Sequence, residues 1–230
     1  MLPQTAYKLL SSYFRLKVEG VEYLPSQGAA IFTPNHSGFS GFDAFILSRQ
    51  IHKGSGRLPY CLAHKLWFQN ERLAQQMQQW GFIPARYSQG QNALERGEMI
   101  ILFPEGEYGN FKPSTQAYTL EEFKTGCIRL AIQTKSPIIP TLIIGAEESH
   151  VNLRRLKFTR KFIGGPLPLP LNLLPFPSRW KIRFFEPIHL PYTIEALRDD
   201  HLMLELAEDL RERMQFALDE ELVQRSSIFF

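Results

Sequence analysis

Residues 137–145 read PIIPTLIIG, an almost unbroken apolar run that is typical of a β-strand covered on both of its faces. Two further runs have the same character, AAIFTPN at 29–35 and MIILFPE at 99–105. Strands of this kind occur in parallel sheets, because the connections between parallel strands carry helices onto both faces of the sheet. These three segments therefore predict an α/β fold.

The rest of the chain continues the alternation of strand and helix. Additional strands are expected at 59–64, 81–86 and 181–188. Helical patterns occupy the N-terminal 14 residues, 42–50, 70–80, 120–134 and 193–224. We therefore expect a single α/β domain over residues 1–230, with a mostly parallel or mixed sheet covered by helices. Its motif-bearing core is expected at about 14–190, followed by a C-terminal helix at 193–224.

Composition excludes several classes of protein. The 230 residues are 44% hydrophobic and carry a net charge of +3, which argues against disorder and permits an anionic partner without requiring nucleic acid. Two cysteines are too few for a disulfide scaffold or a zinc ribbon, and no run of 18 apolar residues is present. Since the first 20 residues lack the features of a secretory signal, we expect a cytoplasmic protein, soluble or peripheral on a membrane.

The first motif with chemical potential is PNHSGFSGFD at 34–43, which follows a predicted strand. His36 and Asp43 are seven positions apart, which is roughly 10 Å along a continuous helix and too far for a hydrogen bond. A His–Asp pair therefore requires the chain to loop back, and Gly38 and Gly41 supply the backbone freedom for it. An aspartate bonded to one imidazole nitrogen would leave the other nitrogen as a general base.

The second motif is ILFPEGEYGN at 101–110, which also ends an apolar strand with a glycine turn. Glu105 and Glu107 are expected at the carboxyl end of that strand. They would lie beside the first motif if the two strands are neighbours in the sheet.

The two motifs in this order resemble those of the glycerolipid acyltransferase family, of the lysophosphatidic acid type. That family combines N-H-x4-D with F-P-E-G-T-R-S. GFIPAR at 81–86 is similar to an intermediate block of the family that ends in an arginine, and PIIPTLIIGAEE at 137–148 is similar to its last block. The resemblance extends from about Phe14 to Ile188.

The resemblance implies an O-acyltransferase that moves a fatty acyl group from acyl-CoA or acyl carrier protein to a hydroxyl of a glycerolipid acceptor. His36 would be the general base and Asp43 would orient it. The substrate-binding residues that the resemblance implies are Asn35, Arg86, Glu105, Gly106 and Tyr108. No metal and no cofactor beyond the acyl donor is implied, and the expected partners are the donor, the lipid acceptor and a membrane surface, with no nucleic acid.

Two departures from the family pattern bear on the acceptor. Six residues instead of four separate His36 from Asp43, a gap that resembles neutral-lipid and phytyl-ester branches. Tyr108 stands where the family has an arginine that is thought to hold a phosphate, and tyrosine brings no charge. Arg86 or Lys112 could take over that role. Diacylglycerol or phytol is therefore an alternative acceptor to lysophosphatidic acid.

Other readings stay open at this level. The basic segment 154–161 and the proline-rich segment 163–180 would suit a membrane surface, but also a solvated face and a strap across the core. A non-catalytic lipid-binding module on the same fold is a second reading. A hydrolase is a third, and it would need Ser37, Ser40 or Cys61 within reach of His36.

Overall fold

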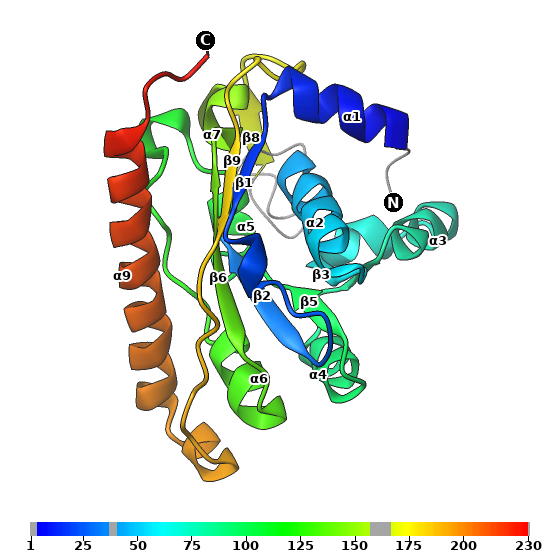
Figure 1. Ribbon diagram of the computed structural model, residues 1–230, viewed down its shortest axis with the longest axis vertical. Helices are drawn as coiled ribbons and strands as arrows, with labels where there is room; N and C mark the ends of the chain where they lie inside the picture. The colour runs from blue at the N-terminus through cyan, green and yellow to red at the C-terminus, as the bar shows by residue number, and fades with distance from the viewer. Residues whose placement is uncertain (1–3, 37–40, 157–166, 230) are drawn as a thin grey trace.

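The computed structural model describes residues 4–36, 41–156 and 167–229, and its centre is a seven-stranded sheet (Figure 1). The strands are β1 (Lys17–Glu19), β2 (Ala30–Pro34), β3 (Tyr60–Ala63), β4 (Phe82–Pro84), β5 (Met99–Ile101), β6 (Ile138–Ile144) and β9 (Lys181–Phe184). They lie in the order β1-β9-β6-β2-β5-β3-β4. Every neighbouring pair is parallel except β6 and β9, so the predicted mixed, mostly parallel α/β sheet is confirmed.

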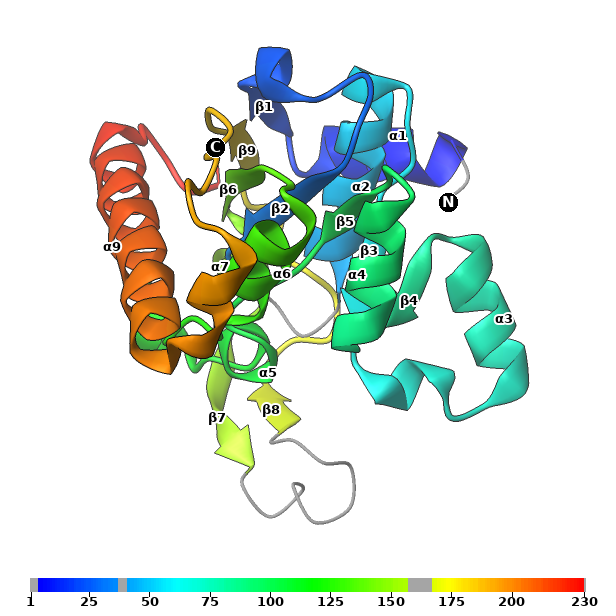
Figure 2. The same ribbon diagram turned by 90° about the horizontal axis from the view of Figure 1, so that it is seen from below.

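Helices cover both faces of this sheet. They are α1 (Gln4–Tyr13), α2 (Phe42–Ser55), α3 (Glu71–Gln79), α4 (Tyr87–Glu95), α5 (Glu107–Asn110), α6 (Gly126–Thr134), α7 (Ala146–Ser149) and α9 (Asp200–Gln224). Buried side chains of α2 and α3 belong to one apolar cluster, and those of α4, α6 and α9 belong to a second. Figure 1 shows α2 and α9 on opposite sides of the sheet, and α4 and α6 lie together when the molecule is seen from below (Figure 2).

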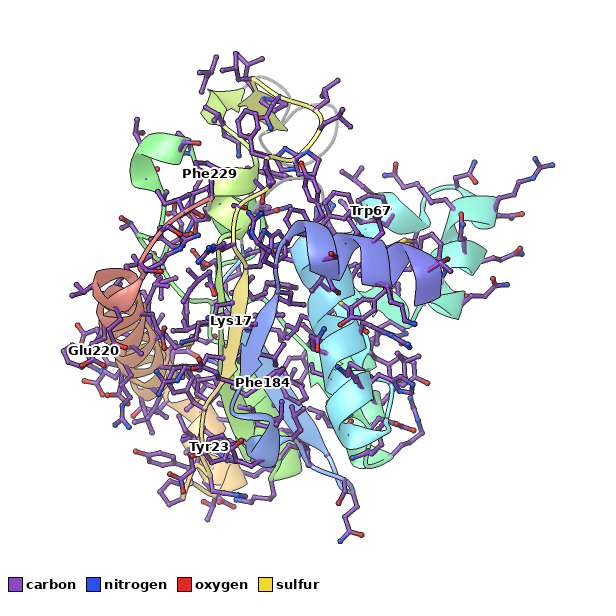
Figure 3. The ribbon with its side chains drawn as sticks, turned by 45° about the horizontal axis from the view of Figure 1, so that its top comes forward. Lys17, Tyr23, Trp67, Phe184, Glu220 and Phe229 are labelled. Carbon is purple, nitrogen blue, oxygen red and sulfur yellow. The ribbon has the colours of Figure 1, made fainter. Side chains whose placement is uncertain are left out.

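The strands explain why two cores form. Along β2, Ala30 and Phe32 pack in the cluster with α2, while Ile31 between them packs in the cluster with α4 and α6. Successive strand side chains point to opposite faces, so a continuous apolar strand must be covered on both. In Figure 3 Phe184 of β9 lies within these layers, whereas Glu220 points away from them on α9.

Several predicted boundaries were wrong, and hydrogen bonds explain two of them. The C-terminal helix begins at Asp200 instead of 193, because Asp199 is extended and its carboxylate caps the helix by accepting from the Leu202 amide. A 3-10 helix, Ile194–Arg198, precedes it. The helix predicted over 120–134 begins at Gly126, since the amides of Glu121 and Lys124 donate instead to Glu105 Oε2 and Pro104 O. The sequence analysis missed β1 and α4.

A small two-stranded sheet of β7 (Asn152–Leu156) and β8 (Leu167–Pro170) projects beside the main sheet (Figure 2). The basic segment 154–161 falls mainly outside the described residues, and nothing is described of the side chains of Arg154 and Arg155. Downstream of β8, residues 171–180 of the proline-rich segment form neither helix nor strand. Leu171, Leu173 and Leu174 are 69–82% exposed, so these side chains do not form a strap across the core.

This topology sets two motifs side by side. The strands β2 and β5 are parallel neighbours, with Phe32 opposite Ile101, so the segments that follow them leave the same edge of the sheet. His36 follows β2 and Glu105 follows β5. No helix within the described residues is long and apolar enough to cross a membrane.

Candidate active site

His36 and Asp43 meet at the carboxyl edge of the sheet. His36 Nδ1 lies 2.6 Å from Asp43 Oδ2, and the Asp43 side chain is completely buried whereas that of His36 is 16% exposed. Asp43 lies in the first turn of α2, where its other oxygen, Oδ1, accepts from the Ala44 amide. A carboxylate only accepts hydrogen bonds, so the imidazole tautomer that fits this contact has its proton on Nδ1 and its lone pair on Nε2. The arrangement can deliver a general base.

Glu105 holds the backbone of His36 in place. Its Oε1 accepts from the His36 amide at 2.9 Å, and its Oε2 accepts from the Glu121 amide at 2.8 Å. Only 1% of the residue is exposed. The sequence suggested that Glu105 binds substrate, but the structure instead turns its carboxylate into the protein, where it joins the segments after β2 and β5 to the segment before α6.

Behind Glu105 lies a buried group of charges. Lys112 Nζ is 3.3 Å from Glu105 Oε2 and 3.2 Å from Glu147 Oε1, and it donates to the Thr119 carbonyl. Burial lowers the pKa of Lys112, but the two carboxylates outweigh that effect and the pKa lies above its ordinary value. Burial raises the pKa of Glu147 to about 7, against the opposing influence of Lys112. Lys112 thus lies between two carboxylates, and it is not among the described residues that line the cavity beside the dyad.

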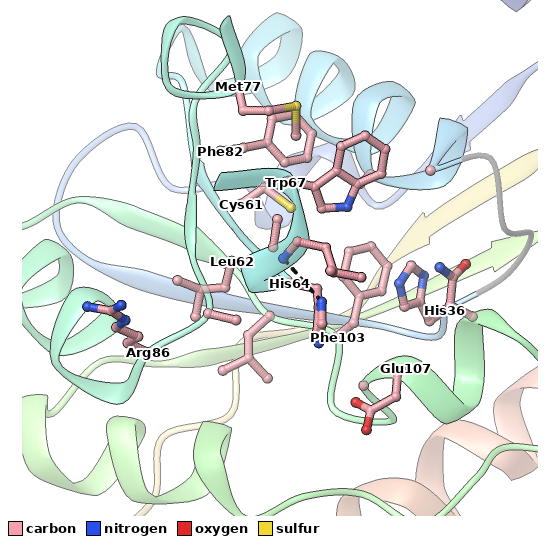
Figure 4. Close-up of a pocket in the computed structure, with 18 of the residues that line it drawn as sticks. His36, Cys61, Leu62, His64, Trp67, Met77, Phe82, Arg86, Phe103 and Glu107 are labelled. Carbon is pink, nitrogen blue, oxygen red and sulfur yellow. Dashed lines mark hydrogen bonds between the residues drawn. The ribbon is translucent and has the colours of Figure 1, made fainter. Parts of the chain in front are cut away.

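A cavity of about 790 Å³ opens beside the dyad, a volume suited to a small-molecule ligand (Figure 4). His36 and Gly106 line it, and most of its wall is apolar. The buried side chains of Cys61, Met77 and Phe82 form part of this wall. Burial raises the pKa of the Cys61 thiol far above its ordinary value, which argues against a thiolate nucleophile there.

A few polar side chains interrupt the apolar lining. Glu107 and Lys124 form an ion pair of 3.0 Å, and both line the cavity. Burial raises the pKa of Glu107, but hydrogen bonds to its backbone and to Lys124 hold the pKa below its ordinary value. His64 caps a 3-10 helix (Lys65–Phe68) by accepting from the Leu66 amide, and burial lowers the pKa of its imidazole. The charges of Glu107 and Lys124 therefore compensate each other at the cavity wall.

The structure places the remaining candidate residues from the sequence in three different environments. Asn35 is fully buried, and its amide exchanges two hydrogen bonds with the backbone of Ile143, so it joins β2 to β6 and is not among the described residues that line the cavity. Tyr108 is half-buried on α5 and is not among the described residues that line the cavity. Arg86 does line it, and Figure 4 shows this side chain across the cavity from His36.

The sequence analysis overlooked other members of the site. The ring of Phe103 stacks on the His36 imidazole with centroids 3.9 Å apart, and Phe103 belongs to the quoted FPEG segment. Glu147 lies in the quoted GAEE segment, but nothing in the sequence places it beside Lys112. Ser37 and Ser40, considered as nucleophiles, lie outside the described residues.

The fold has a counterpart among solved structures. The crystal structure of the 1-acyl-sn-glycerophosphate acyltransferase PlsC from Thermotoga maritima superimposes with a TM-score of 0.60 at 16% sequence identity, over 99% of this chain and 86% of PlsC. At that identity the similarity establishes the fold.

The sequence establishes the family. Residues 15–144 match the family model described as Acyltransferase, and the chain belongs to that family. It is 34% identical to uncharacterized proteins of Mycobacterium tuberculosis and Mycobacterium bovis, and 33% identical to one of Mycobacterium leprae. These matches cover 95% of this chain, which spans 63–65% of the length of the mycobacterial proteins.

Proposed function

We propose that the chain is an O-acyltransferase that moves a fatty acyl group from acyl-CoA or acyl carrier protein to a hydroxyl of a glycerolipid acceptor. The observation that carries this proposal is the 2.6 Å contact between His36 and Asp43 at the wall of a large apolar cavity. A base beside an apolar cavity suits a reaction between a hydroxyl and a long-chain thioester. Family membership and fold agree with it.

In this mechanism His36 activates the acceptor. Its Nε2 takes the proton of the acceptor hydroxyl as the oxygen attacks the thioester carbonyl carbon. Asp43 stabilises the imidazolium that forms, and its bond to Nδ1 keeps the ring in the required tautomer. When the tetrahedral intermediate collapses, the carbon–sulfur bond breaks and Nε2 returns the proton to the leaving thiolate. The protein supplies no covalent nucleophile in this scheme.

The cavity is proposed to hold the acyl chain. Its wall is contributed by α2, β3 (Tyr60–Ala63), α3 and β4, and burying a chain there removes apolar surface from water at roughly 0.8 kcal/mol per methylene. With the chain in place, the thioester would lie at the His36 end.

Two acceptor classes compete for this site. Lysophosphatidic acid requires a cation for its phosphate. Lys112 is buried with two carboxylates, and Lys124 is paired with Glu107, which leaves Arg86 as the cavity-lining candidate. A neutral alcohol such as diacylglycerol or phytol needs none of these charges. The specific observation in its favour is the ion pair of Glu107 and Lys124 at the cavity, because an ammonium already paired with a carboxylate offers a phosphate little net attraction.

We also propose that the protein acts peripherally on a membrane surface. Leu171, Leu173 and Leu174 expose 69–82% of their area after β8, and Leu9 on α1 is 72% exposed. A hydrogen bond from Tyr13 Oη to the Pro175 carbonyl, 2.6 Å long, joins α1 to this segment. Such a group of exposed leucines suits insertion among lipid acyl chains, and the basic stretch at 154–161 would favour anionic headgroups.

The deciding experiment is acyl transfer followed by mass spectrometry. Purified protein is incubated with acyl-CoA or acyl carrier protein and with lysophosphatidic acid, other lysophospholipids, diacylglycerol or phytol. We expect one acceptor class to be acylated and His36→Ala to be inactive although folded. If no acceptor is acylated while PlsC works under the same conditions, the chain is a non-catalytic lipid-binding module.

A further inference from the structure

We propose that Lys112 is a positioning residue for the dyad, acting through Glu105 on the backbone of His36. The inference rests on the proposed acyl transfer only for its kinetic readout. Lys112 does not line the cavity among its described residues, so it has no direct contact with a substrate there. Its influence passes through the carboxylate of Glu105.

Geometry supplies the link. Lys112 Nζ contacts the same Glu105 carboxylate whose Oε1 accepts from the His36 amide at 2.9 Å. His36 directly follows buried Asn35, which is fixed to Ile143, so its amide is anchored on one side by the sheet and on the other by Glu105. A shift of that amide moves the imidazole relative to Asp43, and catalysis is sensitive to displacements of about 1 Å.

Charge explains why a cation is needed at this place. The Glu105 side chain has no exposed area, and an ionised carboxylate without a partner is costly to bury. Lys112 is the cation within 4 Å of Glu105 in the described part of the chain, and its own side chain is 3% exposed. Glu147 contacts Lys112 from α7 at 3.2 Å and also accepts from the Tyr118 amide. Glu147 thus helps to hold the ammonium in place beside Glu105.

Removal of the ammonium therefore has a defined consequence. In Lys112→Met the Glu105 carboxylate is expected to take up a proton or to turn away, because it is buried without a cation. Its bond to the His36 amide then weakens, since a charged acceptor makes the stronger hydrogen bond. The imidazole of His36 is then misplaced while the cavity proposed to bind the acyl chain stays intact. We therefore expect kcat to fall and KM to stay unchanged.

A double-mutant cycle tests the proposal, with Lys112→Met, Glu105→Gln and the double variant. We expect Lys112→Met to lower kcat at least tenfold with KM for both substrates within threefold. In the Glu105→Gln background the same substitution should change kcat less than threefold, because the intermediary is already altered. Effects that multiply in the double variant would overturn the proposal, as would full activity of Lys112→Met.

Lys181→Met is the matched control. Lys181 is also an ammonium between two carboxylates, Glu19 at 2.8 Å and Glu221 at 2.7 Å, but it lies on β9 away from the dyad. We expect its kcat to match the wild type. If Lys112→Met does not fold, Glu105→Gln is compared with the double variant alone, and a tenfold difference between them refutes the proposal.

A second readout does not need activity. In spectra of protein labelled with ¹⁵N-histidine, the Nδ1 proton of His36 reports its bond to Asp43. Lys112→Met should shift or broaden that signal and Lys181→Met should not. An unchanged signal overturns the positioning role, whereas absence of acyl transfer in the wild type would instead overturn the proposed function.

Discussion

The substitution Asp43→Asn tests the base most directly, because the structure determines how the new amide will be oriented. Asp43 Oδ1 accepts from the Ala44 amide at 2.8 Å, while Oδ2 faces His36 Nδ1. An asparagine here must keep its carbonyl oxygen at Ala44, since the reverse orientation would set two N–H groups face to face. Its amide nitrogen then points at Nδ1 and donates to it, which forces the imidazole proton onto Nε2.

That tautomer cannot accept a proton at the position where the acceptor hydroxyl binds. The variant also loses the carboxylate that stabilises the imidazolium. We expect kcat to fall about 10³- to 10⁴-fold, which corresponds to roughly 4–5.5 kcal/mol of activation free energy, with KM nearly unchanged. The size and burial of residue 43 are retained, so the folded state should persist.

The assay is initial-rate acyl transfer from the donor and acceptor identified by mass spectrometry, with circular dichroism to verify folding. Asp219→Asn serves as the control. This exposed aspartate on α9 also accepts a hydrogen bond, from Gln215. If Asp43→Asn keeps kcat within threefold of the wild type while His36→Ala is inactive, the tautomer argument is refuted.

Three further predictions follow from burial and exposure. The pKa of Glu147 lies at about 7 in the folded protein, above its ordinary value of 4.5, so the wild type loses stability as pH rises through this interval. Relative to the wild type, Glu147→Gln should therefore gain about 2–3 kcal/mol of unfolding free energy between about pH 5 and pH 8, measured by urea unfolding. Cys61→Trp should narrow the cavity and shift the preference toward shorter acyl donors, with a difference in activation free energy of about 1–3 kcal/mol for each excluded methylene. Competition assays between donors of different length measure this preference, and an unchanged preference would place the acyl chain elsewhere. The double substitution Leu173→Ser and Leu174→Ser should reduce flotation with anionic liposomes at least tenfold, since each leucine buried in the membrane contributes roughly 1.5–3 kcal/mol of binding free energy. Phe216 on α9 is 66% exposed, and Phe216→Ser should leave flotation unchanged.

Most strands of the sheet and both motifs could be predicted from the amino-acid sequence alone. Runs such as 137–145 are apolar at nearly every position, and only a strand with helices on both faces can bury such a run, so composition and spacing suffice to predict the strand. The pairing of His36 and Asp43 was implied by the resemblance to the acyltransferase family, and two glycines between them allow the chain to loop back. The order of the motifs was enough to indicate the family.

Only the three-dimensional packing shows which polar side chains line the cavity and which are hydrogen-bonded inside the protein. Asn35, Glu105 and Lys112 read as substrate-binding candidates, yet each is buried with partners 7 to 108 positions away along the chain. Other bonds of this kind explain why α6 begins later than predicted. The amides of Glu121 and Lys124 donate to Glu105 Oε2 and to the Pro104 carbonyl, which lie in the segment after β5. Sequence patterns report local periodicity, but a buried hydrogen bond depends on which distant groups the fold brings within about 3 Å, and only the three-dimensional packing specifies that.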